Sequence, residues 1–333
     1  MNPAPLPYWL NAFFHEWLGQ QRNCSRHTIL SYRDTWRLYL RYVAGRRDRS
    51  VSALKLTDLT CEEVLAFLHH VESERHDTIG TRNCRLAALR SFYRFVADRE
   101  PLAAAQCAAV LRIPVKKGPR PALAYLDTEE VNAILRQPDR STLEGQRDEA
   151  LLSLLYNTGA RIQEALGLCP SGIRLTSPEH VRLYGKGRKE RISPIWPETA
   201  ALMAALLKRQ PRLDHEPVFV NRYGRPLGAA GVRFKLAKYV REAAKELPSL
   251  QRKRVHPHTF RHTVGVQMVA AGIDLTTIRG LFGHVSLDTT NHYARANLET
   301  KRRAIEQVDR STRPRHPPRW KRNPNLLTWL DSL

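Results

Sequence analysis

A histidine and an arginine stand three residues apart, near the start of a segment that the sequence predicts to be helical. They are His258 and Arg261, and the helix is expected to end at Gly272. Residues three apart share one face of a helix, so the imidazole and the guanidinium should point the same way. Arginine binds phosphate oxygens through planar, bidentate hydrogen bonds, and histidine exchanges a proton near neutral pH. A buried histidine or a surface arginine is common by itself, but the two together predict a site that grips a phosphate.

A second histidine and a tyrosine follow this pair closely along the chain. Asp274 is expected to cap a helix that stops at Gly283, and His284 comes directly after it. Ser286 is then expected to cap a short helix that bears Tyr293. The sequence therefore predicts a further imidazole and an exposed phenol downstream of the first pair.

Two cations upstream complete the set of candidate site residues. Arg161 follows Gly159 closely, at a point where a new helix can begin, and the backbone N–H groups of a helix start favour anions. Lys186 lies in the turn Gly-Lys-Gly-Arg of a predicted hairpin, whose strands are expected over 180–184 and 190–195. At the tip of such a hairpin, a lysine is free to reach into a groove.

The elements that must position these residues suggest two domains. A chain of 333 residues is long for one domain, and the first 113 residues are predicted to form a compact four-helix bundle. Its helices are expected over 8–21, from the Ser25 cap, from a capping box of Thr60 with Glu63, and over 81–96. The second domain, residues 125–310, is predicted to be mostly helical with a small sheet inserted.

Basic residues on the fourth helix and in the linker are candidate DNA contacts. The helix carries Arg82, Arg85, Arg90 and Arg94 on the face opposite its apolar stripe. The proline-rich linker, residues 114–124, contains Lys116 and Lys117, which would suit a strand draped along phosphates. The alternative for the helix is an ordinary solvated charged face.

The C-terminal segment, residues 311–333, is predicted to be a basic tail. Its arginines and lysines interleave with prolines, which excludes regular helix over that part. Asn325 could cap a final turn or two that carries Leu326, Leu330 and Leu333 along one face. Such a short helix needs a surface to cover, either on its own subunit or on a neighbouring protomer.

The overall charge argues for a polyanionic partner. The chain holds 54 Lys and Arg against 32 Asp and Glu, a formal net charge of +22. High net charge costs self-repulsion, so nucleic acid is a better explanation than a merely soluble basic protein.

Other compositional features point to a reducing compartment and away from membranes. The cysteines are scattered, form no CxxC pair and suggest free thiols; they are Cys24, Cys61, Cys84, Cys107 and Cys169. The N-terminus does not read as a signal peptide, and no stretch approaches the about 20 apolar residues of a membrane span. We therefore expect a cytoplasmic protein without a membrane partner.

The candidate residues, taken in order, resemble the catalytic set of the tyrosine recombinases, also called phage integrases. That set is Arg161, Lys186, His258, Arg261, His284 and Tyr293. The stretches TGARIQEAL, YGKGRKERISPI, HPHTFRHTVGVQMVAAG and LFGHVSLDTTNHY are similar to Xer-type and integron-type members. The resemblance is strong over 125–310 and weaker over the N-terminal part. Gln163 and Phe260 depart from the family's frequent residues at positions that carry no chemistry.

The resemblance implies a fold and a mechanism. The fold would be mainly α, with an N-terminal SAM-like core-binding domain and the DNA-breaking-rejoining catalytic fold. Tyr293 would attack a phosphate to form a 3′-phosphotyrosine. Arg161 and Arg261 would hold the non-bridging oxygens, and Lys186 would protonate the 5′ oxygen. His258 would assist proton transfer, and His284 would hydrogen-bond the phosphate.

The same resemblance bears on helpers and partners. Glu164 is similar to a family acid that orients the site, although an ordinary helix-surface glutamate is an equal reading. No metal, ATP or other cofactor is expected, because two arginines and a lysine supply the positive charge. The expected partners are double-stranded DNA sites with inverted binding sequences and related protomers, in a homotetramer or heterotetramer.

Several alternatives remain open at this stage. A type IB topoisomerase shares much of the chemistry, but His258 disfavours it. An inactive DNA-binding accessory protein is disfavoured because all six positions are intact. Within the family, the long tail favours integration, excision or transposition of a mobile element over chromosome-dimer resolution by a Xer-type enzyme.

Overall fold

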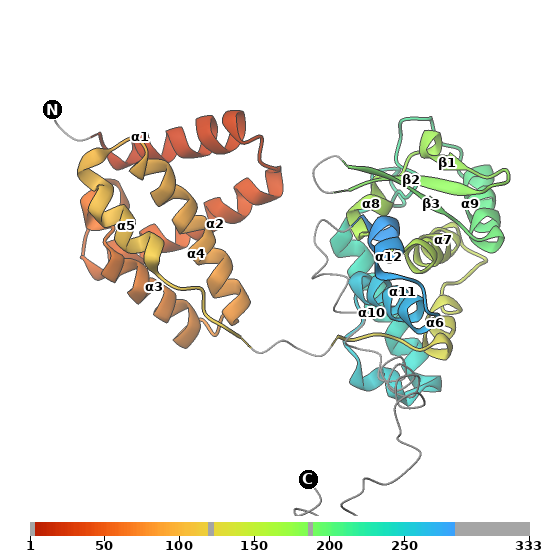
Figure 1. Ribbon diagram of the computed structural model, residues 1–333. Helices are drawn as coiled ribbons and strands as arrows, with labels where there is room; N and C mark the ends of the chain where they lie inside the picture. Colours follow the sequence, from red (N-terminus) through yellow and green to blue (C-terminus); the bar gives the residue numbers. More distant parts are fainter. Residues whose placement is uncertain (1–3, 119–122, 186–188, 284–333) are drawn as a thin grey trace, which may run out of the picture. The chain divides into compact units, whose positions relative to one another are not determined.

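The chain divides into two compact units, residues 1–120 and 121–333, in the computed structural model shown in Figure 1. The structure describes residues 4–118, 123–185 and 189–283. Both units are mostly helical, and the second carries a small antiparallel sheet, as the sequence predicts. Over the described ranges, no helix has both the length and the apolar character that crossing a membrane would require.

The first unit is a helical bundle around one central helix. α4 packs against α2, α3 and α5. The main elements are α1 (Leu6–Asn11), a π-helical continuation of it (Ala12–Gln21), α2 (Arg26–Arg46), α3 (Cys61–Ser73), α4 (Ile79–Ala97) and α5 (Ala104–Arg112). Short 3-10 turns over Val51–Ala53, Leu56–Asp58 and Pro101–Ala103 connect them.

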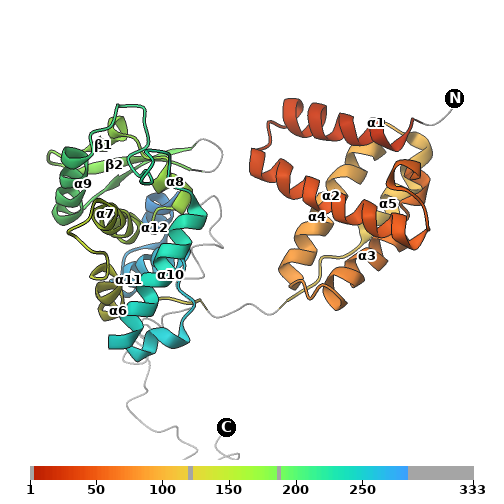
Figure 2. The same ribbon diagram turned by 180° about the vertical axis from the view of Figure 1, so that it is seen from behind.

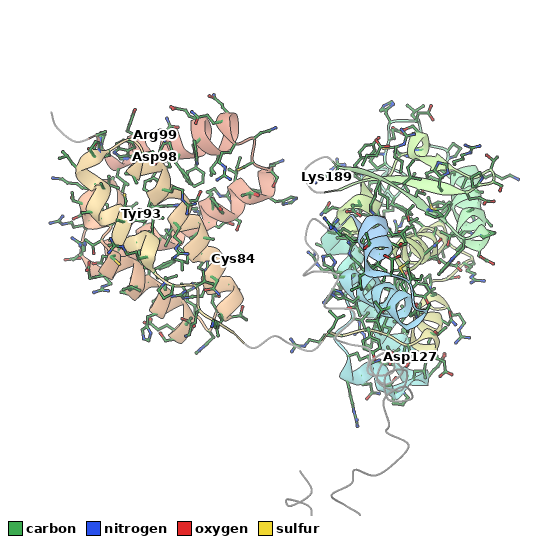
Figure 3. All side chains as sticks on the ribbon, viewed as in Figure 1. Cys84, Tyr93, Asp98, Arg99, Asp127 and Lys189 are labelled. Atoms are coloured by element: carbon green, nitrogen blue, oxygen red, sulfur yellow. The ribbon has the colours of Figure 1, made fainter. Side chains whose placement is uncertain are left out.

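Aromatic side chains fill the core of this bundle. Phe13, Phe92 and Phe95 are buried together with Trp36. Tyr93, labelled in Figure 3, is also fully buried, and its hydroxyl donates a hydrogen bond of 2.6 Å to the Leu59 carbonyl. The hydroxyl is therefore satisfied without water, as a buried polar group must be.

The helix starts follow local capping chemistry. The Ser25 hydroxyl accepts from the Thr28 N–H, and the Thr60 hydroxyl accepts from the Glu63 N–H, as expected. α4 begins at Ile79 rather than at residue 81, because Thr78 acts as its cap. α5 was not predicted from the sequence.

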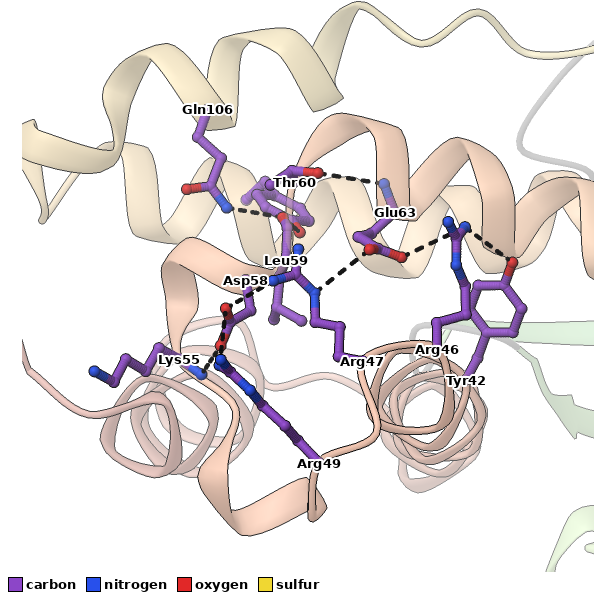
Figure 4. Close-up of polar contacts among 11 residues, drawn as sticks. Tyr42, Arg46, Arg47, Arg49, Lys55, Asp58, Leu59, Thr60, Glu63 and Gln106 are labelled. Atoms are coloured by element: carbon purple, nitrogen blue, oxygen red, sulfur yellow. Dashed lines mark hydrogen bonds and ion pairs between the residues drawn. The ribbon is translucent and has the colours of Figure 1, made fainter.

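Ion pairs lock the turn between α2 and α3. Arg47 and Arg49 lie 3.0 and 3.8 Å from the Asp58 carboxylate. Arg46 and Arg47 lie 3.7 and 3.4 Å from the Glu63 carboxylate (Figure 4). Part of the positive charge of this unit is thus neutralised by its own acids.

The second unit surrounds the helix α7 (Leu143–Thr158). α7 packs against α6 (Thr128–Leu135), α8 (Ile162–Leu166), α9 (Pro197–Arg209) and α11 (Pro257–Ala270). The remaining helical elements of the described residues are α10 (Ala229–Glu246), α12 (Leu275–Phe282) and 3-10 turns over Pro170–Gly172 and Pro248–Arg252. α7 is buried on most of its faces, so its residues read as continuous core rather than as an amphipathic stripe.

The sheet lies at one end of this unit, beside α9, and α6 lies at the other end (Figure 1, Figure 2). Within the described ranges its strand order is β1 (Ile173–Arg174), β2 (His180–Tyr184), β3 (Glu190–Pro194). β2 and β3 pair antiparallel, with Val181 opposite Ser193 and Leu183 opposite Arg191. The predicted hairpin is confirmed, whereas β1 was not foreseen.

Two helices of this unit start at a side-chain cap. α7 begins at Leu143, because the Thr142 hydroxyl accepts a hydrogen bond from the Gly145 N–H. α6 is capped by Asp127, which forms a reciprocal capping box with Glu130. Short polar side chains just ahead of a helix thus decide where it starts.

Candidate active site

The turn that presents Arg161 is built on a glycine. α7 ends at Gly159, whose φ of 57° is the left-handed conformation that glycine adopts without strain. A Cβ at this position would lie 2.5 Å from the Phe282 ring. The chain then turns sharply through buried Ala160, and Arg161 caps α8 with its side chain 31% exposed. The tight turn brings Arg161 to the surface at the end of the central helix.

Arg261 joins the ends of two helices. It is only 3% exposed, and its guanidinium donates hydrogen bonds of 2.6 Å to the Gly159 carbonyl and 2.8 Å to the Phe282 carbonyl. Its Cζ also lies 4.5 Å from the centre of the Phe282 ring. The predicted phosphate ligand therefore also holds the C-terminal ends of α7 and α12 together.

His258 lies exposed at the start of α11, in a row of imidazoles. The His256 and His262 ring centres are 6.4 and 6.2 Å away, and the His262 ring lies nearly parallel to that of His258. Loss of hydration lowers the pKa of His258, and so do the nearby positive charges, first that of Arg261; Glu164 opposes them. The ring is therefore neutral at neutral pH and able to accept a proton.

Glu164 is the hub of the polar contacts around Arg161. It is 4% exposed; one carboxylate oxygen accepts from the Arg161 side chain at 2.6 Å, and the other accepts from Arg191 at 3.0 Å. Burial alone would raise the pKa of Glu164, but the hydrogen bond from Arg161 and the charge of Arg191 outweigh it and leave the pKa below its usual value. The carboxylate is thus ionised and shared between two guanidinium groups.

An open pocket of about 470 Å³ lies over these contacts. Its walls come from the α8 start, from the β2–β3 hairpin and from α12. The lining residues include Arg161, Glu164, Gly185, Lys189, Glu190, Arg191, Arg279 and Gly283. Four of these residues are cationic, so the pocket suits an anion. Lys189, labelled in Figure 3, directly precedes β3 of the hairpin.

Some predicted site residues lie outside the described residues. They are Lys186, His284 and Tyr293, together with the tail over 311–333. Gly185 and Gly283, which are the described chain neighbours of Lys186 and His284, both line the pocket. The structure thus brings Arg161 and Glu164 to this pocket and places His258 and Arg261 on the adjoining helix, α11.

The predicted DNA contacts of the first unit have partners within that unit. Arg90 donates to the carbonyls of Leu111 and Ile113, and Arg82 donates to the Pro114 carbonyl at 3.2 Å. Arg85 pairs with Asp77, Lys116 pairs with Glu72, both at 2.8 Å, and Lys117 is exposed. The start of the predicted linker is therefore tied along α4.

One site residue, Arg191, was not considered from the sequence. Side chains alternate between the two faces of a strand, so Arg191 lies on the same face as Ser193 and Ile195, which are buried. This alternation was the signal that could have placed Arg191 on the inward side. Glu164 was considered, and its burial removes the reading as an ordinary surface residue. Among the described residues, no group of three or more His, Cys, Asp or Glu side chains is arranged to hold a metal ion. All five cysteines are free thiols.

Family models match both units. The model described as the phage integrase family matches residues 124–300, and the phage integrase N-terminal SAM-like domain matches residues 11–100. The chain belongs to the phage integrase family, and it is an enzyme of the tyrosine recombinase class.

Similar proteins extend this assignment over the full length. The putative integrase/recombinase y4rC of Sinorhizobium fredii is 37% identical over 330 residues, which cover 99% of this chain and 98% of the relative. The tyrosine recombinase XerD of Halalkalibacterium halodurans is 33% identical over 293 residues, covering 85% of this chain and 91% of the relative.

Solved structures share the fold. XerH recombinase bound to a palindromic difH substrate has a TM-score of 0.67 at 19% identity, with 90% of this chain and 85% of that chain covered. The Tn1549 transposon integrase in complex with transposon right end DNA has a TM-score of 0.64 at 17% identity, with coverage of 89% and 98%.

Proposed function

We propose that this enzyme cleaves and rejoins double-stranded DNA through a covalent bond between Tyr293 and a 3′ phosphate. The observation that carries the proposal is the cationic pocket around the Arg161–Glu164 pair, next to the His258–Arg261 pair on α11. The matching order of all six family-type residues along the chain supports it.

The proposed step balances without an energy source. The Tyr293 oxygen bonds to phosphorus, and the bond from phosphorus to the 5′ oxygen breaks. The tyrosine proton passes to His258, which acts as the base. Lys186 then supplies a proton to the leaving 5′ oxygen. One phosphodiester replaces another, so the reverse attack by a 5′ hydroxyl reseals a strand without ATP.

Charge stabilisation is assigned to the arginines. Arg161 and Arg261 would bind the non-bridging oxygens, on which negative charge builds up in the transition state. A single phosphate fits a pocket with several cations in its walls, because opposite charges attract. A guanidinium that is already held in place also needs no rearrangement during the reaction. The mechanism therefore assigns no step to a metal or cofactor.

His258 is assigned the part of proton acceptor. Its lowered pKa keeps the ring neutral near pH 7, and a neutral imidazole has a nitrogen lone pair available for the tyrosine proton. His284 is assigned a hydrogen bond to the phosphate.

The partner and the biological role are part of the same proposal. We assign a recombination site with inverted binding sequences and assembly as a tetramer, and a cytoplasmic location. XerH is bound to a palindromic difH substrate, and the Tn1549 integrase is bound to transposon right end DNA. The basic residues Arg82, Arg85, Arg90, Lys116 and Lys117 remain candidates for contacts with phosphates.

Movement of a mobile element is the role we favour. The relative y4rC, named an integrase/recombinase, matches over nearly its whole length, and a transposon integrase has the same fold. Chromosome-dimer resolution is the second candidate, favoured by the matches to proteins named XerC and XerD. Recombination between element ends, compared with recombination between two copies of a chromosomal terminus site, separates the two roles.

Tyr293→Phe tests the chemistry directly. The variant should bind DNA normally and form no covalent adduct, because only the hydroxyl is lost. A nicked suicide substrate traps the adduct of the unaltered enzyme on a denaturing gel. An adduct of equal yield from the Phe variant would assign the nucleophile to another residue.

A further inference from the structure

Arg191 occupies a position where a strand would normally carry an apolar residue. It lies on β3, opposite Leu183, and shares the inward side of the strand with Ser193. Its side chain is only 9% exposed. Burying a guanidinium costs several kcal/mol unless it is paired and hydrogen-bonded, so its surroundings must compensate for that cost.

Three elements meet at this guanidinium. One terminal nitrogen donates to the Glu164 carboxylate at 3.0 Å, and the other donates to the Leu281 carbonyl in the last turn of α12. A Cβ at Gly283 would lie 3.2 Å from Arg191 Cδ, which shows how closely the arginine stem approaches the end of α12. Arg191 therefore joins β3, α8 and α12 on the wall of the pocket.

The shared carboxylate links this contact to Arg161. Glu164 accepts from Arg191 with one oxygen and from the Arg161 side chain with the other. The oxygen facing Arg191 also accepts from the Arg161 backbone N–H at 3.1 Å. The orientation of Glu164, and with it that of the Arg161 guanidinium, is thus fixed from the far side by Arg191.

We propose that Arg191 is a positioning residue for strand cleavage. It holds the Glu164 carboxylate in place behind Arg161, and it anchors the end of α12, from which the chain continues to His284. The inference rests on the proposed function, because it assigns Arg191 a role in the same cleavage step. Arg191 would not contact the phosphate; it would act through Glu164 and through the end of α12.

Removing Arg191 should change the charge state of Glu164. The carboxylate would stay buried but keep only Arg161 as a close cation, so its pKa should rise. The other charged groups that line the same pocket are Lys189 and Glu190 on the hairpin and Arg279 on α12, and the charge of Glu164 also acts on His258 on α11. Within the described residues, the hydrogen bonds that Glu164 accepts through its side chain come from Arg161 and Arg191.

The sign of the pH effect follows from this. In the unaltered enzyme, the lowered pKa keeps Glu164 ionised throughout the neutral range. In Arg191→Met, the carboxyl should protonate as the pH falls toward the raised pKa, and Arg161 then loses its orienting partner. The cleavage rate of the variant should therefore still rise with pH above neutrality, where His258 of the unaltered enzyme is already neutral and the rate of that enzyme has levelled off.

The test compares Arg191→Met and Arg191→Lys with a control that removes a cation from the same sheet, Arg174→Met. Arg174 lies exposed on β1. Each full-length variant is assayed for thermal stability, for gel-shift affinity, and for single-turnover cleavage of the nicked suicide substrate at several pH values. Arg191→Met should cleave roughly 10²-fold more slowly near neutral pH, as expected when a transition-state contact is lost. Its DNA affinity and the behaviour of the control should stay near those of the unaltered enzyme.

A double-mutant cycle separates positioning from simple structural support. In a Glu164→Gln background, Arg191→Met should reduce cleavage by no more than roughly tenfold further, because the two residues act as one unit. If Arg191→Met does not fold, Arg191→Lys tests whether Arg191 positions the site. A lysine keeps the charge but cannot bridge the carboxylate and the Leu281 carbonyl in one plane, so cleavage should fall while the fold is kept.

Three outcomes would overturn the inference: undiminished cleavage, parallel losses of binding and cleavage, or an equal loss in the Glu164→Gln background. Tyr293→Phe runs alongside to keep the two proposals distinct. If that variant loses the adduct while the Arg191 variants cleave normally, only the role of Arg191 fails. If it retains the adduct, the proposed function fails.

Discussion

The arginines of α4 and those around the pocket of the second unit have different surroundings. On α4, Arg90 donates to the carbonyls of Leu111 and Ile113 at the end of α5, Arg82 donates to the Pro114 carbonyl, and Arg85 pairs with one aspartate. In the second unit, Arg161 and Arg191 converge on a single carboxylate at an open pocket.

Positive charge in the sequence is therefore a poor guide to where a phosphate binds. An arginine whose donors reach nearby carbonyls organises its own chain, whereas cations that share one buried acid form a preorganised surface. The distinction depends on the acceptors, which the pattern of arginines along a helix does not reveal. Three substitutions challenge or sharpen this contrast, starting with the largest expected effect.

Arg161→Ala should reduce cleavage by roughly 10²–10³-fold, because it removes a donor from the charge that develops in the transition state. DNA affinity should change far less, since the enzyme contacts many phosphates and this variant loses one. Single-turnover cleavage and gel-shift affinity are measured on the same substrate, with Arg174→Ala as the control. Equal losses in both assays would remove Arg161 from the catalytic set.

Gly159→Ala should destabilise the second unit by roughly 2–5 kcal/mol, the sum of a left-handed alanine and a clash with the Phe282 ring. Gly45→Ala is the matched control in the first unit. Open space surrounds Gly45 in the last turn of α2, so alanine should stabilise the helix by up to about 1 kcal/mol. Calorimetry of the full chain follows both units. If Gly159→Ala leaves the stability unchanged, the Phe282 ring at the end of α12 must move easily to make room for the methyl group.

Arg90→Met should lower the stability of the first unit by about 1–2 kcal/mol, because two carbonyls lose a charged donor. Arg94, exposed on the same helix, is the comparison. Arg94→Met should leave stability unchanged and reduce the salt dependence of DNA binding by about one unit of slope if that face meets phosphates. If Arg90→Met instead changes the slope and not the stability, Arg90 contacts DNA in the complex.

Local signals in the sequence predicted much of the framework. The caps at Ser25 and Thr60 and the hairpin all depend on residues within a few positions of one another. The sequence did not predict α5, because this alanine-rich segment has few large apolar side chains to form a recognisable buried face; its buried residues are Cys107 and Val110.

The site was only partly predictable, for a related reason. His258 and Arg261 share a helix, so their spacing alone indicated a pair. Arg191 meets Glu164 only because the hairpin has a particular register and α12 packs on β3, and both are properties of the tertiary structure.

The contact between Gly159 and Phe282 also limits how this enzyme can diverge. The left-handed turn admits few residues other than glycine, and the ring leaves no room for a Cβ. The same ring lies against Arg261, so shrinking it to make room would loosen a proposed phosphate ligand. Positions 159 and 282 therefore form one steric unit. A side chain at position 159 would need both the left-handed backbone and a smaller residue at position 282, and that smaller residue would loosen the arginine.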